Sequence, residues 1–161
     1  MTIKLDPIVE FREDHRKVRD GLLELASAAE SGDLAKARQT LGVLNTLVGP
    51  HFRYEEEALY PALRQFLGEY VDQLIEEHNG VIETARKAAE LLSKTSLSPE
   101  EERAVAKAAR GLLVHVSNCD GLNILVERMN PEQLARLAER YQASRDAGVG
   151  LLQWAGTIRG K

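Results

Sequence analysis

The chain has 161 residues, of which 43% are hydrophobic and 29% charged, and its formal net charge is −4. This length and composition are typical of one globular domain over residues 1–161, and the acidic charge argues against nucleic acid or an anionic membrane surface as a partner. Its single cysteine, Cys119, excludes an internal disulfide. The sequence has no apolar run near the ~20 residues of a membrane span and no signal-peptide pattern at its start. We therefore expect a cytoplasmic protein.

The first half of the chain predicts two long helices. Strand signals are nearly absent, and residues that favour helices dominate: Ala, Leu, Glu, Arg and Lys. We expect the first helix over about residues 6–32, because it opens with an N-cap aspartate and a first-turn proline. The second is expected over about residues 33–66, with a bend at Gly49-Pro50, since proline clashes with the preceding turn.

The second half predicts two further long helices and a helical tail. A third helix is expected over about residues 69–93, and a fourth from Ser98-Pro99 to Asn130. A shorter helix follows over about residues 132–145. Connections of a few residues favour antiparallel neighbours, so we expect an all-α fold. Its predicted architecture is an up-down-up-down antiparallel four-helix bundle over about residues 6–129, with a short C-terminal helical extension over about 131–161.

The last residues of this extension carry an apolar face. It contains Leu151, Trp154, Ala155 and Ile158. We expect this face to pack on the bundle, and a dimer contact is the alternative. The sequence is therefore compatible with a monomer or a homodimer.

The four histidines lie one on each predicted long helix, always on its apolar stripe: His15, His51, His78 and His115. For any one of them, an isolated core histidine bonded to a backbone carbonyl is the simpler explanation. If a stripe covers roughly a third of a helix surface, however, all four would fall on it by chance only about once in 80 trials. They also lie at similar depths in the bundle, where unpaired imidazoles would be costly to bury.

Glu55 follows His51 by one helical turn and points to the same face. Neutral imidazole and carboxylate are metal ligands, and a mixed nitrogen and oxygen set favours iron or manganese, with zinc as another candidate. Four-helix bundles often hold a dinuclear carboxylate site in their core. The sequence therefore predicts a metal centre at the level of the histidines.

The chain resembles the hemerythrin-like (HHE cation-binding) family in four stretches that span residues 11–126. They are EDHR around His15, HFRYEEEALYP from His51, EEHNGV around His78 and HVSNCD from His115. The resemblance implies a non-haem di-iron site, two iron ions with an oxo or hydroxo bridge, inside a four-helix bundle. The metal ligands that it implies are His15, His51, Glu55 as a bridging carboxylate, His78, His115 and Asp120.

Two positions depart from the family pattern. Oxygen-carrying members have a second histidine one turn before His78, where this chain has Leu74, and this argues against reversible oxygen carriage. Many bacterial members have a glutamate four residues after His115, where this chain has Cys119. Helix geometry directs Cys119 toward the site and leaves Asp120 in need of a bend, whereas the pattern of the oxygen carriers favours Asp120 as the ligand.

The leading expectation is a di-iron protein that binds or reacts with oxygen, nitric oxide or peroxide in sensing, scavenging or stress defence. One alternative is a protein that stores or donates iron, related to iron–sulfur repair proteins. Another is a bundle with a degenerate metal site that acts in protein interaction. Each would work with a redox or protein partner that the sequence does not identify.

Overall fold

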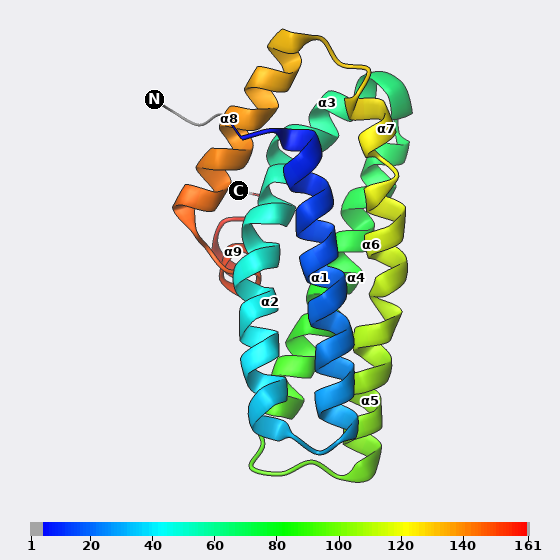
Figure 1. Ribbon diagram of the computed structural model, residues 1–161, viewed down its shortest axis with the longest axis vertical. Helices are drawn as coiled ribbons and strands as arrows, with labels where there is room; N and C mark the ends of the chain where they lie inside the picture. Colours follow the sequence, from blue (N-terminus) through cyan, green and yellow to red (C-terminus); the bar gives the residue numbers. More distant parts are fainter. Residues whose placement is uncertain (1–4, 161) are drawn as a thin grey trace.

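The computed structural model describes residues 5–160, and its regular secondary structure there is entirely helical (Figure 1). The elements in chain order are α1 Pro7–Glu30, α2 Leu34–Tyr54, the π-helix η1 Glu55–Leu59, α3 Tyr60–Leu67, α4 Tyr70–Leu92, α5 Pro99–Gly111, α6 Leu113–Asp120, α7 Asn123–Val126, α8 Pro131–Ala147 and α9 Leu151–Thr157. Helices α1, α2, α4 and the run α5–α7 lie side by side along the long axis of the molecule. The predictions of an all-α fold and a helical bundle are confirmed.

The predicted helix starts are explained by side-chain capping. The Asp6 carboxylate accepts hydrogen bonds from the backbone N–H groups of Ile8 and Val9 at the start of α1. Ser98 and Asn130 each form a reciprocal capping box in front of a proline, at the starts of α5 and α8. These bonds satisfy N–H groups that have no partner inside the helix, which fixes where each helix begins.

Two of the long helices are less regular than the sequence indicated. The α-helix continues through Pro50, and its irregular turn is the π-helix that begins at Glu55. The predicted fourth helix is divided at Leu112 and again at Gly121, the residue that follows α6. Both irregular regions adjoin predicted metal ligands, which is where π-turns and strained helix geometry are commonly found.

The buried apolar side chains form two clusters along the bundle. One contains Val18, Leu22, Leu44, Val48 and Phe52, among others. The other contains Phe11, Tyr54, Tyr60, Leu74 and Tyr141, among others. His15 falls between Phe11 and Val18 along α1, and His51 between Val48 and Tyr54 along α2, so a polar layer separates the two clusters.

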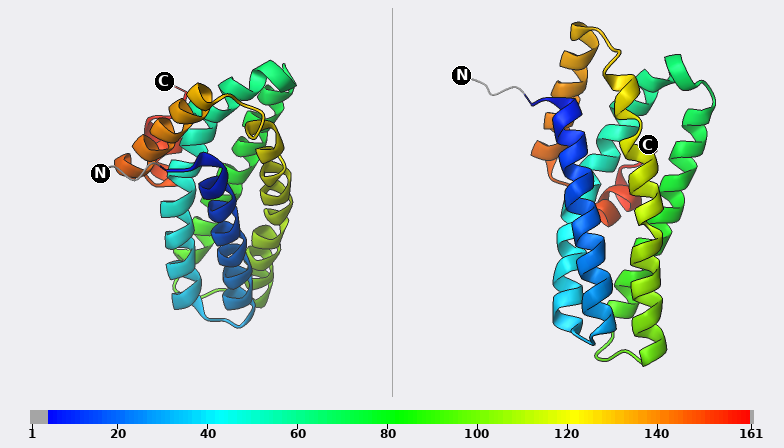
Figure 2. Two further views of the ribbon diagram at one scale, coloured as in Figure 1. Left: turned by 45° about the horizontal axis from the view of Figure 1, so that its top comes forward. Right: turned by 45° about the vertical axis from the view of Figure 1, so that its right-hand side comes forward.

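The C-terminal extension packs on the bundle. Helix α8 contacts α2, α1 and η1, and α9 contacts α2 and α4 (Figure 2). Tyr141 and Trp154 are 0% and 1% exposed, so the extension contributes side chains to the buried interior.

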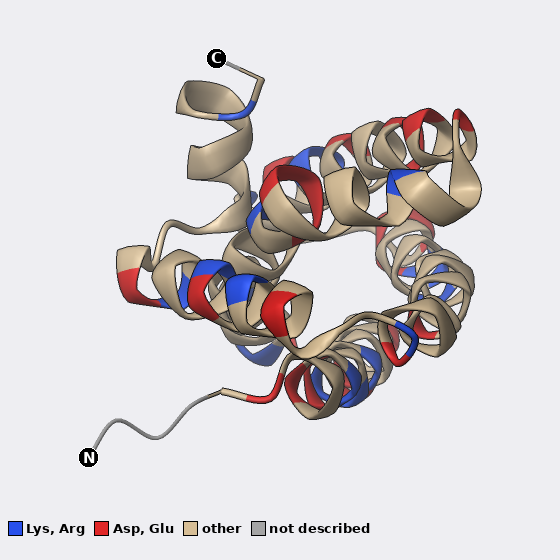
Figure 3. Cartoon of the chain, turned by 90° about the horizontal axis from the view of Figure 1, so that it is seen from above, with Lys and Arg blue, Asp and Glu red and all other residues tan. Residues whose placement is uncertain are grey.

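Seen from above, the four long segments form a ring with the C-terminal end outside it, and charged residues of both signs are spread around the helices (Figure 3). Among residues 5–160, no helix has the length and apolar character needed to cross a membrane.

Candidate metal centre

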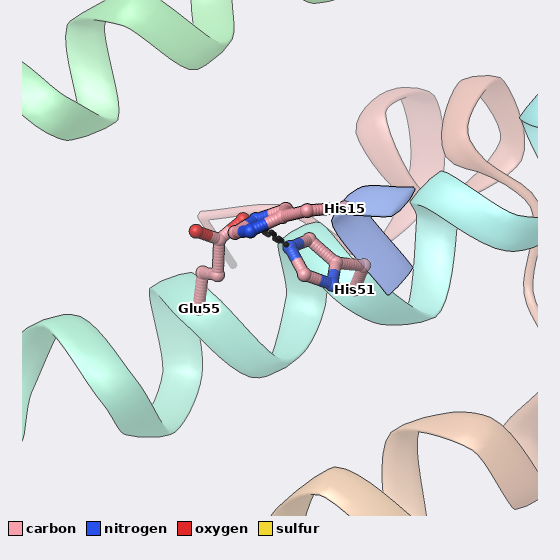
Figure 4. A group of neighbouring side chains, drawn as sticks. All are labelled: His15, His51 and Glu55. Atoms are coloured by element: carbon pink, nitrogen blue, oxygen red, sulfur yellow. Dashed lines mark hydrogen bonds and ion pairs between the residues drawn. The ribbon is translucent and has the colours of Figure 1, made fainter. Parts of the chain in front are cut away.

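Three predicted ligands from two neighbouring helices and the π-turn meet in the buried polar layer (Figure 4). The Nε2 atoms of His15 and His51 are 3.1 Å apart. The Nε2 atom of His51 is 3.3 Å from Oε1 of Glu55. All three side chains are buried, and their ligand atoms lie within 4.8 Å of one another, a spacing that could hold one metal ion.

The other two histidines lie outside this group of three, and one of them is also close to Glu55. The Nε2 atom of His78 is 3.5 Å from Oε1 of Glu55. The ring centroids of His78 and His115 are 5.3 Å apart. The same oxygen of Glu55, Oε1, is therefore close to a ring nitrogen of His51 and to one of His78.

Every histidine contacts a carboxylate through its other ring nitrogen, Nδ1. The pairs and their distances are His15 with Asp120 at 3.0 Å, His51 with Asp14 at 2.9 Å, His78 with Glu56 at 2.7 Å and His115 with Glu77 at 3.1 Å. A carboxylate accepts a hydrogen bond from Nδ1–H, so the neutral ring keeps its lone pair on Nε2. All four rings are thereby set to present a lone pair at Nε2.

One oxygen of Glu55 tests whether a metal ion fits these residues. Oε1 is fully buried and accepts no hydrogen bond from any described residue. An unpaired buried oxygen is costly, and more so when it carries charge. A cation among the Nε2 atoms and Oε1 would remove this cost, so the donor set and the unpaired oxygen fit a metal ion.

The electrostatics of the site favour an ionised carboxylate. Burial acts to raise the pKa of Glu55, but His51, His78 and His15 together hold it well below its usual range. Burial acts to lower the pKa of His51, yet Glu55 and Asp14 outweigh it and raise that pKa. For His15, burial and the neighbouring His51 prevail and lower the pKa.

Cys119 and Asp120, the two candidate ligands from the fourth predicted helix, lie at different ring nitrogens of the histidines next to them. The Sγ atom of Cys119 lies 3.5 Å from Nε2 of His115, on the inner side of that ring. Asp120 lies behind His15, on its Nδ1 side, and its side chain is 43% exposed. The directions of both side chains agree with the helix geometry, in which residues four apart share a face and residues five apart do not.

Tyr60 is a residue of the site that the sequence analysis missed. Its hydroxyl donates a hydrogen bond to Oε2 of Glu55 at 3.0 Å and lies 3.1 Å from Nε2 of His78. In an α-helix, a residue five positions after Glu55 would face away from it. The wider π-turn between them brings the two onto one face. Leu74 packs in the same apolar cluster as Tyr60.

The carboxylates at the Nδ1 atoms were also missed, although acidic residues next to the histidines are a sequence signal. Asp14 precedes His15 in the chain but bonds to His51, and Glu77 precedes His78 but bonds to His115. Each therefore supports a histidine on the neighbouring helix. Sequence adjacency alone does not reveal this crossed pairing.

A comparison with protein-family models matches residues 6–122 to the hemerythrin HHE cation-binding domain. Comparisons with curated proteins and with solved structures gave no significant match. The match covers most of the chain and includes every histidine of the site together with Glu55. The chain belongs to the hemerythrin HHE cation-binding domain family.

Proposed function

We propose that this protein holds two iron ions in the polar layer of an up-down-up-down bundle. His15 and His51 would hold one ion, His78 and His115 would hold the other, and Glu55 would supply a carboxylate oxygen to the centre. The observation that carries this proposal is the unpaired Oε1 atom of Glu55, which lies 3.3 Å from Nε2 of His51 and 3.5 Å from Nε2 of His78. The mixed nitrogen and oxygen donors favour iron or manganese over zinc, and we propose iron because the chain resembles the di-iron hemerythrins.

For Asp120 we propose a supporting role in place of the ligand role that the sequence pattern implied. Its carboxylate accepts a hydrogen bond from His15 at Nδ1, which leaves Nε2 of that ring free for metal. Cys119 lies on the inner side of His115, but burial and Glu55 raise the pKa of its thiol. This thiol is therefore protonated in the metal-free protein, and a metal ion that bound its sulfur would have to displace the proton.

The site adjoins an apolar cavity of about 80 Å³. Its lining includes Val18, Leu22, Val48, Phe52 and Leu112, with four polar residues of the centre at its end: His15, His51, Glu55 and His115. Apolar cavities of this kind stay dry and accept small apolar molecules. This supports oxygen or nitric oxide as the molecule that the site binds or reacts with, and peroxide is a third candidate.

When bound, iron supplies one-electron chemistry and a position for a small ligand. The chain's own residues surround that position. The Tyr60 hydroxyl is a buried hydrogen-bond donor to Glu55 and lies beside His78. Leu74 is 2% exposed and offers no donor atom, so the second iron has fewer protein ligands than in oxygen-carrying hemerythrins. We therefore propose sensing, scavenging or stress defence rather than oxygen carriage.

The test is to load the metal-free protein with iron(II) under low oxygen and measure iron content and the absorption spectrum. Addition of nitric oxide, oxygen or peroxide should then change the spectrum of the loaded protein and leave that of metal-free protein unchanged. Loss of iron to an apo acceptor during this reaction would instead favour the storage or donation function. A protein that takes up no iron would favour the bundle with a degenerate site.

A further inference from the structure

The four carboxylates that contact the histidines differ in their exposure to water. The side chains of Asp120 and Glu77 are 43% and 39% exposed, so water solvates their charges. Those of Asp14 and Glu56 are only 3% and 11% exposed. A buried carboxylate needs protein partners to stay ionised and in place, so the support of His51 and His78 depends on what surrounds Asp14 and Glu56.

Asp14 receives its partners from α8. The Tyr141 hydroxyl donates a hydrogen bond to Oδ2 of Asp14, the same oxygen that lies 2.9 Å from Nδ1 of His51. Arg145 donates to the other oxygen, Oδ1, at 3.0 Å.

Glu56 receives its partner from the residues that follow α9. The Nε atom of Arg159 donates to both oxygens of Glu56, at 2.9 and 3.1 Å. The same guanidinium is anchored by the side chain of Asn79 and by the backbone oxygen of Ile75 on α4. This arginine joins the end of the described chain to the carboxylate that holds His78.

These partners lie in the C-terminal extension, outside the part of the chain that the family model matches. The extension is held by close packing on α2. A Cβ atom added at Gly49 would lie 2.2 Å from the backbone oxygen of Val149, so glycine permits this approach. The Asn45 side chain also accepts a hydrogen bond from the backbone N–H of Leu152 at 2.9 Å.

We infer that the C-terminal extension completes the metal centre, with Tyr141 and Arg159 as positioning residues that act through Asp14 and Glu56. Tyr141 and Arg145 hold Asp14, which keeps the proton of His51 on Nδ1. Arg159 holds Glu56, which does the same for His78. One histidine of each proposed iron site is thus oriented by the extension. The claim that the extension matters for metal binding rests on the proposed function. The effect of the extension on the orientation of the histidine rings does not, because it is present in the metal-free protein.

The experiment measures which ring nitrogen of each histidine carries the proton, by long-range proton–nitrogen NMR of metal-free protein at a pH where the rings are neutral. In Arg159→Gln, His78 should lose its single Nδ1–H form while His51 keeps it. In Tyr141→Phe, His51 should change while His78 does not. A merely structural role of the extension would not produce this crossed pattern.

Two controls separate orientation from stability. Arg136→Gln removes an exposed ion pair with Glu132 on α8 and should leave all four rings unchanged. Leu137→Ala removes a buried side chain of α8 that is 3% exposed. It should lower the melting temperature without a selective change at His51 or His78.

Affinity for iron(II), measured by competition with a chelator, is the second measurement. Arg159→Gln and Tyr141→Phe should each weaken it by about 10- to 100-fold, the usual effect of losing a residue that orients a ligand. The inference is overturned if both variants keep wild-type rings and wild-type affinity, or if both disturb the four rings alike. Failure of the wild type to bind iron would refute the proposed function, and the ring measurement would still decide this inference.

Discussion

Three consecutive glutamates, Glu55 to Glu57, take three different roles in this region. Glu55 points inward to the histidine Nε2 atoms, Glu56 accepts from Nδ1 of His78, and Glu57 pairs with Arg53 at the surface. The π-turn contributes to this arrangement, because its wider turn brings Glu55 and Tyr60 onto the same face. The proposed metal ligand Glu55 and the carboxylate that contacts His78 are thus adjacent in the chain.

The inward role of Glu55 leads to a paired test. Glu55→Gln removes the charge that two iron ions would share, so iron bound per chain should fall by at least half. Glu57→Gln makes the same chemical change two residues away, on a side chain that is 37% exposed, and should leave iron content at the wild-type level. Metal analysis after desalting gives both values, and equal iron in the two variants would contradict the assignment of Glu55.

The buried carboxylates also predict an acid-sensitive stability. The pKa values of Asp14 and Glu56 are lowered in the folded protein, so the unfolded chain takes up their protons first as the pH falls. Their contribution is complete above the unfolded pKa, and it is lost as the pH drops below about 4.5, the ordinary value for glutamate. Urea unfolding of metal-free protein between pH 7 and pH 3.5 should show this loss.

Glu56→Gln provides the comparison for that pH profile. The variant lacks one of the titrating carboxylates, so its free energy of unfolding should fall less steeply below pH 4.5 than that of the wild type. Profiles that run parallel through the acid range would show that Glu56 does not contribute to the pH dependence.

At the scale of residues, the sequence identified the inward-facing donors but not their partners. The histidines and Glu55 fall on the apolar stripes of their helices, and such a stripe is a local periodic pattern that a sequence displays. The Nδ1 contacts join residues from different helices, such as Asp14 and His51, and these depend on how the helices are rotated against each other. Tyr60 was missed because the α-helical period does not hold across the π-turn.

The helices themselves follow from local chemistry, whereas their irregularities follow from packing. The capping residues Asp6 and Ser98 predicted two helix starts, because a cap acts within one turn. The sequence predicted a bend at Gly49-Pro50, whereas the structure places the irregular turn at Glu55, beside the predicted metal ligands. Only glycine at position 49 allows the backbone of residues 149–150 to approach so closely. No local sequence pattern reveals this contact.

Substitutions at two glycines of α2 test whether the close packing of the extension on this helix is required for stability. Gly49→Ala would place a methyl group against the Val149 backbone and should destabilise the protein by about 1–3 kcal/mol. Gly42→Ala meets nothing within 4 Å and should stabilise the same helix by about 0.5–1 kcal/mol. Urea unfolding measures both changes. A Gly49→Ala variant as stable as the wild type would show that the close contact with the extension is not required.

At the scale of the molecule, the bundle could be predicted and the contribution of the extension could not. Apolar periodicity and short connections indicate packed helices before any contact is known. The bonds from Tyr141 to Asp14 and from Arg159 to Glu56 join residues 127 and 103 positions apart. Such contacts exist only after the whole chain has folded, and they tie the last helices to the first.

The layered interior predicts that metal stabilises the whole fold. Binding that occurs only in the native state raises the free energy of unfolding by about 2.7 kcal/mol at a free metal concentration 100 times Kd. Anaerobic iron(II) should therefore raise the melting temperature of the wild type and have little effect on Glu55→Gln. Identical melting of metal-free and iron-treated wild type would contradict a site built from these residues.

The central claim is that Glu55 lies between two iron ions, each held by a pair of histidines. The most direct measurement is a crystal structure of the iron-loaded protein with anomalous differences recorded at the iron edge. We predict two iron peaks, one beside the Nε2 atoms of His15 and His51 and one beside those of His78 and His115, with Glu55 in contact with both. A single peak, or iron bound at the Nδ1 side of the rings, would contradict the account.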